Sequence, residues 1–497
     1  MLITSSIFLD FIILLVTGLY ILHIYISKKH KYWKERGVYF PKPKPFVGNF
    51  LDIVLLKQSL GDWLKDLYDQ NDKDFFGIYV FDDPFLVVKD PKLIKNILIK
   101  NFNSFLDRTV SPLDHSPFTA HMLLFQKNPG WKLGRSKLSA VFSSGKMKSM
   151  FPLLLESADD MVHFLQKNQT SLETRELFAN YTTDVISKCA LGIHSHSFKS
   201  SDSMFTIQRR KIFEFSFRNA FTQTMYFLKP NWVTRFKMEF VEKNIMEYFT
   251  RVFKESLRAR TTKNKTYSDL IDIMNEIKET EKVKNDDNDE VVFCGAALNF
   301  FIAGFEPAST TISYTLYELA VNPHIQQTAR EEAAAVIKKH GGITLDALRD
   351  MLYFDMSINE TLRKYPGLPF LQRNCNEDFP VPDSDVVIEK GTPILIPITG
   401  LQLDEKLFPD PHKYDPERFR NKTDSGNGLY FLPFGDGQRA CIGERFGRIM
   451  TKLALTSILT NFEVTKCSET PVPIIFEPKS FLLLSNVGVP LQFKKLQ

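Results

Sequence analysis

Near its carboxyl end the chain reads Phe434-Gly435-Asp436-Gly437-Gln438-Arg439-Ala440-Cys441-Ile442-Gly443. The cysteine stands between glycines, behind an arginine and just before the helix-like run from Glu444 to Leu455. Glycine suits so tight a loop because it adopts positive φ without penalty and lets the backbone approach a flat ligand. The start of a helix favours a thiolate over a thiol, since unpaired N–H groups and the positive dipole end face it. The loop therefore predicts a thiolate that can ligate iron. A buried structural cysteine in a glycine turn is the alternative.

The pattern Phe-Gly-x-Gly-x-Arg-x-Cys-x-Gly resembles the haem-binding loop of the cytochrome P-450 superfamily at every fixed position. The resemblance runs in order over residues 40 to 497, through four mutually spaced motifs. It implies a mainly α fold with small β-sheets, in which a triangular helical domain binds haem b beside a small β region. Cys441 would be the iron ligand and would supply electron density for O–O cleavage. The run from Gly443 to Ile449 looks most like the insect detoxification branch of the microsomal enzymes.

Bulk composition limits the function classes. The chain has 497 residues, of which 43% are hydrophobic and 24% charged, as in ordinary globular proteins. Its five scattered cysteines show no CxxC spacing, which argues against a disulfide framework and for a reducing compartment. A net charge of +5 is too mild to indicate a nucleic-acid partner. The 44 phenylalanines predict a large apolar interior or apolar cavities.

The amino-terminal segment is predicted to cross a membrane. From Ile7 to Ile26 the sequence is almost free of charge, and about 20 apolar residues suffice to span a hydrocarbon core. Basic residues follow at once and none precedes the span, so the positive-inside rule places the rest of the chain in the cytosol. The resemblance to the microsomal enzymes implies that this membrane is the endoplasmic reticulum, with the catalytic domain facing the cytosol. A cleaved signal peptide is the alternative, weakened by the missing basic n-region and small-x-small cleavage site.

Three regions are predicted: a membrane anchor over 1–27, a basic, proline-rich hinge over 28–46 and a haem-thiolate catalytic domain over 47–497. Prolines at 41, 43 and 45 should keep the hinge stiff and extended. Alternating apolar residues at 77–80 and 85–89 predict a hairpin joined by Asp82-Asp83-Pro84. Helical periodicity dominates 150–257, a charged connector is expected over 276–290, and short strands are expected near 380–398 and 480–493.

The resemblance assigns residues to the haem carboxylates. Trp131 and Arg135 match the Trp-x-x-x-Arg motif that contacts a propionate in the superfamily. Arg373 and Arg439 fit the other propionate contacts, and Arg108 fits them less well. Forked guanidinium groups suit this role because they pair with carboxylates in a bidentate manner. The predicted cofactor-binding set is Trp131, Arg135, Ala303, Arg373, Phe434, Gly435, Arg439, Cys441 and Gly443.

A second motif is architectural. Glu360 and Arg363 are spaced i and i+3 and share a helix face, and alone such a pair would be ordinary surface decoration. In the superfamily this pair and the arginine of the later Pro-Glu-Arg-Phe segment form a buried ionic network behind the haem loop. Arg418 matches that arginine.

The oxygen-activation helix departs from the family. The stretch from Phe300 to Thr311 resembles a distal helix whose usual pattern is Ala-Gly-x-Glu/Asp-Thr, but Pro307 replaces the threonine. Proline removes the N–H that would bond to the Ala303 carbonyl, which predicts a kink. We hypothesise that water held at that carbonyl, with Glu306 as proton source, replaces the lost hydroxyl and that more peroxide leaks. The predicted catalytic residues are Cys441, Glu306 and Pro307.

Electrons are expected to come from a partner, because the sequence holds no flavin or nicotinamide fingerprint. Basic residues between 131 and 150 suggest a docking face for an acidic donor, together with Arg445, Arg448 and Lys452. A solvated basic helix is the alternative. The resemblance names NADPH-cytochrome P-450 reductase as the donor, with cytochrome b5 as a further partner.

The sequence thus predicts a monooxygenase that inserts one oxygen atom from O2 into lipophilic substrates, either xenobiotics or endogenous lipids and hormones. Aromatic and basic residues from Phe205 to Trp232 predict an amphipathic lid at the membrane interface. Two other classes stay open. One is a haem-thiolate isomerase or dehydratase that does not use O2, which Pro307 favours, and the other is a non-catalytic lipophile-binding protein.

Overall fold

The computed structural model describes residues 7–110, 113–168, 171–199, 203–263, 287–421 and 430–496. Most of the predicted charged connector over 276–290 lies outside these ranges, and its residues from 287 onward belong to a long helix. Helices dominate and three small sheets accompany them, which confirms the predicted fold class.

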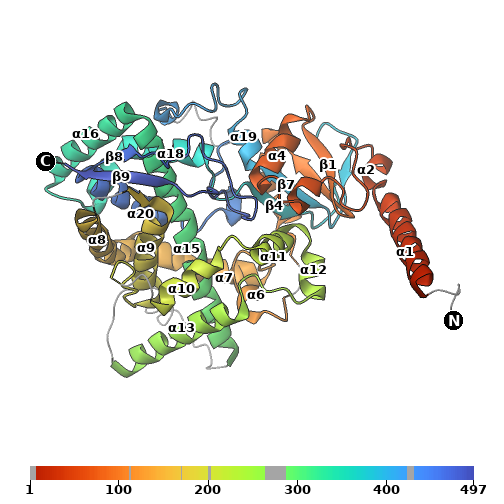
Figure 1. The fold of residues 1–497 in the computed structure, drawn as a ribbon, viewed down its shortest axis with the longest axis horizontal. Helices are drawn as coiled ribbons and strands as arrows, with labels where there is room; N and C mark the ends of the chain where they lie inside the picture. Colours follow the sequence, from red (N-terminus) through yellow and green to blue (C-terminus); the bar gives the residue numbers. More distant parts are fainter. Residues whose placement is uncertain are drawn as a thin grey trace.

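The helices lie on both sides of the long helix α15 (Asp287–Val321), which runs through the middle of the molecule in Figure 1. In sequence order, the described helices that precede α15 are α1 (Ile7–Lys29), α2 (Tyr32–Glu35), α3 (Leu51–Val54), α4 (Leu60–Asp69), α5 (Pro91–Lys95), α6 (Pro117–Ala120), α7 (Gly130–Ser139), α8 (Ser144–Lys167), α9 (Thr174–Ile186), α10 (Met204–Ile212), α11 (Phe217–Leu228), α12 (Pro230–Arg235) and α13 (Lys243–Lys263). Those after it are α16 (Pro323–His340), α17 (Leu345–Asp350), α18 (Leu352–Lys364), α19 (Ile398–Gln402) and α20 (Glu444–Leu459).

The strands form three separate sheets. The largest has the order β1-β2-β7-β4, with β1 (Phe75–Val80), β2 (Asp83–Val88), β7 (Pro393–Pro397) and β4 (Phe370–Asn374). A second has the order β3-β9-β8, with β3 (Ser171–Glu173), β9 (Pro490–Lys495) and β8 (Phe462–Lys466), and β5 (Phe379–Pro380) pairs with β6 (Val387–Ile388). The predicted hairpin is confirmed: β1 and β2 are antiparallel, Val80 pairs with Asp83, and the turn is Phe81-Asp82.

Close packing fixes the position of α15. A Cβ on Gly304 would lie only 2.7 Å from Cδ1 of Ile186, so α9 and α15 meet where one side chain is absent. Phe301 and Phe305 on α15 are both buried in the main core. The distal helix is therefore held by its neighbours on the α9 side and does not depend on its own sequence alone for its position.

The amino-terminal helix α1 projects away from the end of the molecule that carries β1 and α4 (Figure 1). Within the segment Ile7–Glu35, a stretch of 18 residues has a mean hydropathy of 2.3 and is only 6% buried, and this segment alone among the described helices is long and apolar enough to cross a membrane. Helix α1 ends at Lys29, two residues beyond the predicted anchor.

The predicted hinge is not a spacer that stands apart from the body. Trp33 is buried and its Nε1 donates to the Ile78 carbonyl at 3.1 Å. A Cβ on Gly77 would lie 2.3 Å from Cγ of Trp33, so the indole rests directly on strand β1. The residues that follow α1 are thus docked onto the large sheet.

Candidate active site

Backbone hydrogen bonds close the cysteine loop on itself. The Cys441 amide donates to the Phe434 carbonyl at 2.7 Å, and the Ala440 amide donates to the Gly437 carbonyl at 3.0 Å. The Asp436 carboxylate accepts a hydrogen bond from the Gly437 amide at 2.7 Å. Helix α20 begins three residues after Cys441, which confirms that the cysteine precedes a helix.

Two glycines of the loop need their missing side chain. The φ angles are +70° at Gly435 and +69° at Gly437, a region that side chains disfavour. A Cβ on Gly437 would also lie 2.1 Å from the Leu98 carbonyl oxygen. Gly443 does not need this freedom, because its φ is −93°. Gly443 ends the loop in ordinary backbone and caps α20.

The protein alone does not favour a thiolate at Cys441. The residue is open to solvent on one side, but the surrounding protein raises the pKa of its thiol. Backbone N–H groups of Gly443 and Glu444 and the Arg135 guanidinium act in the opposite direction without outweighing burial. The helix start therefore offsets only part of the effect of burial on this pKa. A coordinated metal ion deprotonates a thiol outright, so this environment suits a sulfur that is a ligand.

Four arginines gather beside the loop, as the predicted propionate contacts required. Burial and the guanidinium of Arg108 lower the pKa of Arg439 to about 9 and that of Arg373 well below its usual range. Burial and Arg135 lower the pKa of Arg108 to about 10. The carboxylate of Asp107 lies 3.2 Å from Nη2 of Arg439. Nε of Arg373 and Nη1 of Arg439 are buried without a hydrogen-bond partner. This group of cations has room for further carboxylates.

Helix α7 joins this group to the loop. Trp131 is buried, and the guanidinium carbon of Arg439 lies 4.1 Å from the centre of its ring. Nη1 of Arg135 donates to the Ala440 carbonyl at 2.7 Å, next to the cysteine. Both residues of the Trp-x-x-x-Arg motif therefore face the cysteine loop.

The predicted ionic network behind the loop is confirmed. Glu360 and Arg363 on α18 are fully buried and make two parallel hydrogen bonds, at 2.7 and 2.8 Å. Nε of Arg418 lies 3.4 Å from Oε1 of Glu360, within ion-pair distance but not aligned as a hydrogen bond. Arg363 also donates to the carbonyl groups of Gln402 and Pro411, at 2.8 and 2.7 Å. The network ties α18 to the segment that leads to the cysteine loop.

On the distal side, Pro307 lies inside a helix that continues beyond it. The hydroxyl of Thr311 donates to the Pro307 carbonyl at 2.8 Å, and that of Ser309 donates to the Glu306 carbonyl at 2.9 Å. Both hydroxyls bond to carbonyls further along the helix, so neither of these bonds reaches the Ala303 carbonyl. Ala303, one turn before the proline, is exposed.

Glu306 does not share that open environment. Its side chain is only 3% exposed, and Nε of Arg175 on α9 lies 2.6 Å from its Oε1. Nη2 of Arg175 reaches the Phe213 carbonyl at 3.4 Å, and its guanidinium lies 5.0 Å from the centre of the Phe215 ring. The sequence hypothesis made Glu306 the proton source for a water held at the Ala303 carbonyl, whereas the structure holds its carboxylate in an ion pair. No sequence signal marked Arg175, which lies 131 positions away.

A hollow of about 750 Å³ lies on the outer side of the cysteine loop, with Cys441 in its wall. Arg445 and Lys148, both exposed, line it and belong to the predicted docking face. Lys452 also lines the hollow, but it is buried and its Nζ donates to Asp355 and to the Leu348 carbonyl, both at 2.7 Å. Its charge is therefore already paired inside the protein.

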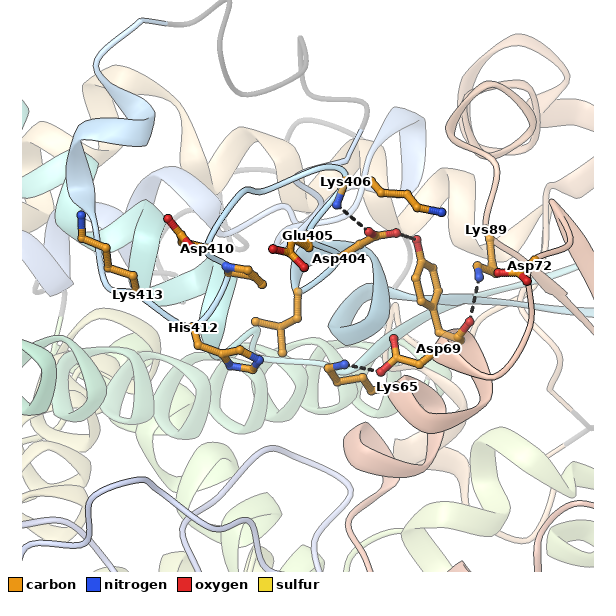
Figure 2. Close-up of a pocket in the computed structure, with 13 residues that line it drawn as sticks. Lys65, Asp69, Asp72, Lys89, Asp404, Glu405, Lys406, Asp410, His412 and Lys413 are labelled. Atoms are coloured by element: carbon orange, nitrogen blue, oxygen red, sulfur yellow. Dashed lines mark hydrogen bonds and ion pairs between the residues drawn. The ribbon is translucent and has the colours of Figure 1, made fainter.

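A second hollow, of about 760 Å³, lies between α4 and residues 403–413, and Cys441 does not line it. In Figure 2 Lys65 reaches Asp69, and the hydroxyl of Tyr68 donates to Asp404 at 2.6 Å. Within the described ranges, no group of three or more His, Cys, Asp or Glu side chains could hold a metal ion. We assign no ligand to this hollow.

The predicted lid comprises α10, α11 and α12. Some of its aromatic side chains are exposed and others are buried. Phe217 is 68% exposed and Phe221 38% exposed. Phe227 is buried, and its ring stacks on that of Phe481 with centres 5.5 Å apart. Only part of the predicted aromatic face is therefore open to the outside.

These residues fit a haem. Cys441 would ligate the iron, and the unpartnered nitrogens of Arg373 and Arg439 would bind its carboxylates. The glycine loop allows the backbone to lie close to the macrocycle, and the exposed Ala303 leaves space on the distal side.

Comparison with known proteins agrees with this geometry. A family model described as Cytochrome P450 matches residues 39–491. The chain is 38% identical to cytochrome P450 6k1 of Blattella germanica over 515 residues, covering 99% of this chain and 98% of the relative. It is 37% identical to cytochrome P450 6j1 of Blattella germanica, with 99% of each chain covered. It is also 33% identical to the probable cytochrome P450 6a13 of Drosophila melanogaster, with 98% of this chain and 99% of the relative covered. These relatives match the insect branch expected from the sequence, and the chain belongs to the cytochrome P450 family.

Proposed function

We propose that this haem-thiolate monooxygenase takes electrons from NADPH through a separate reductase, with cytochrome b5 as a further donor. Its substrates would be lipophilic molecules, either xenobiotics or endogenous lipids and hormones. The observation that carries this proposal is the meeting of the Cys441 loop with the buried guanidinium groups of Arg373 and Arg439, each of which keeps one nitrogen without a partner. Family membership supports the oxygen chemistry.

Bound haem b would supply the activation of dioxygen. The chain would contribute the sulfur ligand from Cys441 and carboxylate contacts from Arg373, Arg439, Arg135 and Trp131. The buried network of Glu360, Arg363 and Arg418 would hold the cysteine loop in place. The exposed Arg445 and Lys148 would guide an acidic reductase to the outer side of the loop.

Proton delivery on the distal side is hindered. Proline leaves the Ala303 carbonyl without its helical donor, so a water molecule can bind there. Glu306 can give a proton to that water only after its ion pair with Arg175 opens. We therefore expect part of the reduced oxygen to leave as peroxide.

The membrane helix and lid complete the proposal. Helix α1 would anchor the protein in the endoplasmic reticulum membrane with the body on the cytosolic side, as the basic residues after Ile26 favour. The exposed Phe217 and Phe221 of the lid would contact the lipid interface and admit lipophilic substrates.

The test is a reconstituted assay of the full-length haem protein with reductase and NADPH against a panel of lipophiles. Product, peroxide and NADPH consumption are measured together, and Cys441→Ala is the control. Product that depends on O2, NADPH and Cys441 is expected. Turnover without O2 would instead support an isomerase or dehydratase, the second candidate that Pro307 favours. Substrate binding without NADPH consumption would support a non-catalytic lipophile-binding protein.

A further inference from the structure

The end of the membrane helix and the base of the lid meet at one carboxylate. Nζ of Lys29, the last residue of α1, lies 2.7 Å from Oδ2 of Asp82. Nζ of Lys229, just before α12, contacts the other oxygen of Asp82 and lies 2.7 Å from Oδ2 of Asp83. Lys29 and Lys229 are 200 residues apart in sequence, and Asp82 lies at the tip of the β1–β2 hairpin.

The hairpin tip is shaped for these contacts. Phe81 has a φ of +56°, a left-handed conformation that is unusual for a bulky side chain and tends to mark functional positions. Its carbonyl accepts a hydrogen bond from Nε2 of His30 at 2.8 Å. Its ring packs on Trp232 of α12, with centres 4.8 Å apart. One strained residue therefore contacts both the segment after α1 and the lid.

The lid side of this contact is enclosed, whereas Lys29 on the anchor side is 40% exposed. Lys229 has a side-chain exposure of only 5%, between two carboxylates. Burial alone would raise the pKa of Asp82, but the hydrogen bonds from Lys229 and Lys29 outweigh it and the pKa is lowered. Removing Asp82 would leave Lys229 with one partner and Lys29 with none of the contacts that join it to the body. Breaking such an enclosed pair costs far more than breaking a surface pair.

Trp232 is also the centre of an aromatic surface, which we define as Phe221, Trp232 and Phe236. The rings of Phe221 and Phe236 lie 6.5 and 6.2 Å from that of Trp232, and Phe236 is 61% exposed. Arg235 and Lys237 beside it are exposed. Tryptophan with nearby cations is the composition that membrane interfaces select. Six helical residues span about 9 Å, so α12 cannot carry this surface far from the end of α1.

We propose that Asp82 couples the membrane anchor to the lid and holds the aromatic surface against the bilayer that α1 crosses. The partner of this surface is the lipid interface, and Asp82 is a positioning residue. The inference rests on the proposed membrane anchorage of α1. It adds that the orientation of the lid is set by the anchor through one carboxylate.

The test measures the depth of Trp232 in the membrane. Full-length haem protein is placed in phosphatidylcholine vesicles whose acyl chains carry bromine near the headgroup, and tryptophan quenching is recorded. The Trp232 contribution is the difference from a Trp232→Phe variant. We compare the parent with Asp82→Asn, and with Asp69→Asn as a matched control, because Asp69 pairs with Lys65 on α4 away from the anchor.

We expect strong quenching of Trp232 in the parent and in Asp69→Asn, and loss of most of it in Asp82→Asn. Lys229→Met should give the same loss by removing the lid side of the contact, and it replaces Asp82→Asn if that variant fails to retain haem. Absence of quenching in the parent would overturn the lipid contact. Equal quenching in the parent and in the variants would overturn the coupling. Because the readout is fluorescence, a failed monooxygenase assay would leave this result intact.

Discussion

The two sides of the proposed haem site are built differently. On the proximal side, the cysteine loop is fixed by two positive-φ glycines, by backbone hydrogen bonds and by the buried network at Glu360. On the distal side, Pro307 takes the threonine position, and Glu306 is paired with Arg175 and closed off from solvent. The proximal side can therefore hold its ligand without rearrangement, whereas proton supply on the distal side requires an ion pair to open. The position of the metal ligand and the delivery of protons are separate properties of this fold.

The largest effect is expected at Gly437. Gly437→Ala places a Cβ at 2.1 Å from the Leu98 carbonyl oxygen in a backbone region that alanine disfavours, so we expect loss of folded, haem-binding protein. The measurement is haem absorbance per mole of soluble protein. Gly447→Ala is the control, because it lies in α20 with no atom within 4 Å of the added methyl, and it should retain haem fully. Equal haem retention by both variants would show that the loop is not rigid.

Glu360→Gln tests the proximal network next. Removing one partner of a fully buried ion pair costs about 3–5 kcal/mol, because Arg363 keeps an uncompensated charge. The free energy of unfolding in denaturant measures this loss. Glu417→Gln, which breaks the exposed pair with Arg420, serves as control and should change stability little. A small loss in both variants would contradict the network's role.

Arg175→Gln tests the distal side. It leaves the Glu306 carboxylate buried without its cation, and we expect a loss of about 1–3 kcal/mol. Adding Glu306→Gln should recover part of that loss, because the pair is then replaced by two neutral amides. Denaturant unfolding of both single variants and the double variant gives the coupling energy. Additive losses would mean that the two residues do not act as a pair.

The smallest change in stability is expected for a substitution of Arg373, and this change should be stabilising where the others are destabilising. Burial lowers its pKa and one of its nitrogens lacks a partner, so Arg373→Met should stabilise the haem-free protein while weakening haem retention. Denaturant unfolding of the haem-free form and the rate of haem transfer to an acceptor protein measure the two effects. If the variant destabilised the haem-free form, Arg373 would be structural and not reserved for a carboxylate ligand.

The buried arginines also make the stability of the haem-free protein depend on pH. The pKa of Arg439 is lowered from its usual range to about 9, chiefly by burial, so above pH 9 the unfolded chain binds more protons at this group than the folded one. The stability contribution of Arg439 in the haem-free protein should therefore rise as the pH increases above about 9. Comparing unfolding of the haem-free parent with that of Arg439→Gln between pH 8 and about 10.5 isolates it. A difference between the two that is independent of pH would contradict the assignment.

Local motifs predicted the residues of the proximal side from sequence, because the relative positions of these residues depend on short segments of backbone. The glycines around Cys441, the i, i+3 pair on α18 and the i, i+4 pair on α7 all place their side chains by backbone geometry alone. The partners that sequence reasoning missed are remote in sequence: Arg175 for Glu306, Asp107 for Arg439 and Lys229 for Asp82. Each depends on how elements pack, which no local pattern specifies. The pairing of Lys452 was missed for the same reason, since its partner Asp355 lies on α18.

The central claim is that the distal side, and not the cysteine loop, limits coupling. The most direct measurement is the ratio of peroxide to product in the reconstituted full-length enzyme, compared between the parent and Pro307→Thr. Restoring the hydroxyl should lower this ratio while haem content and the Glu306–Arg175 pair stay unchanged. An unchanged ratio would contradict the account and would place the limit elsewhere.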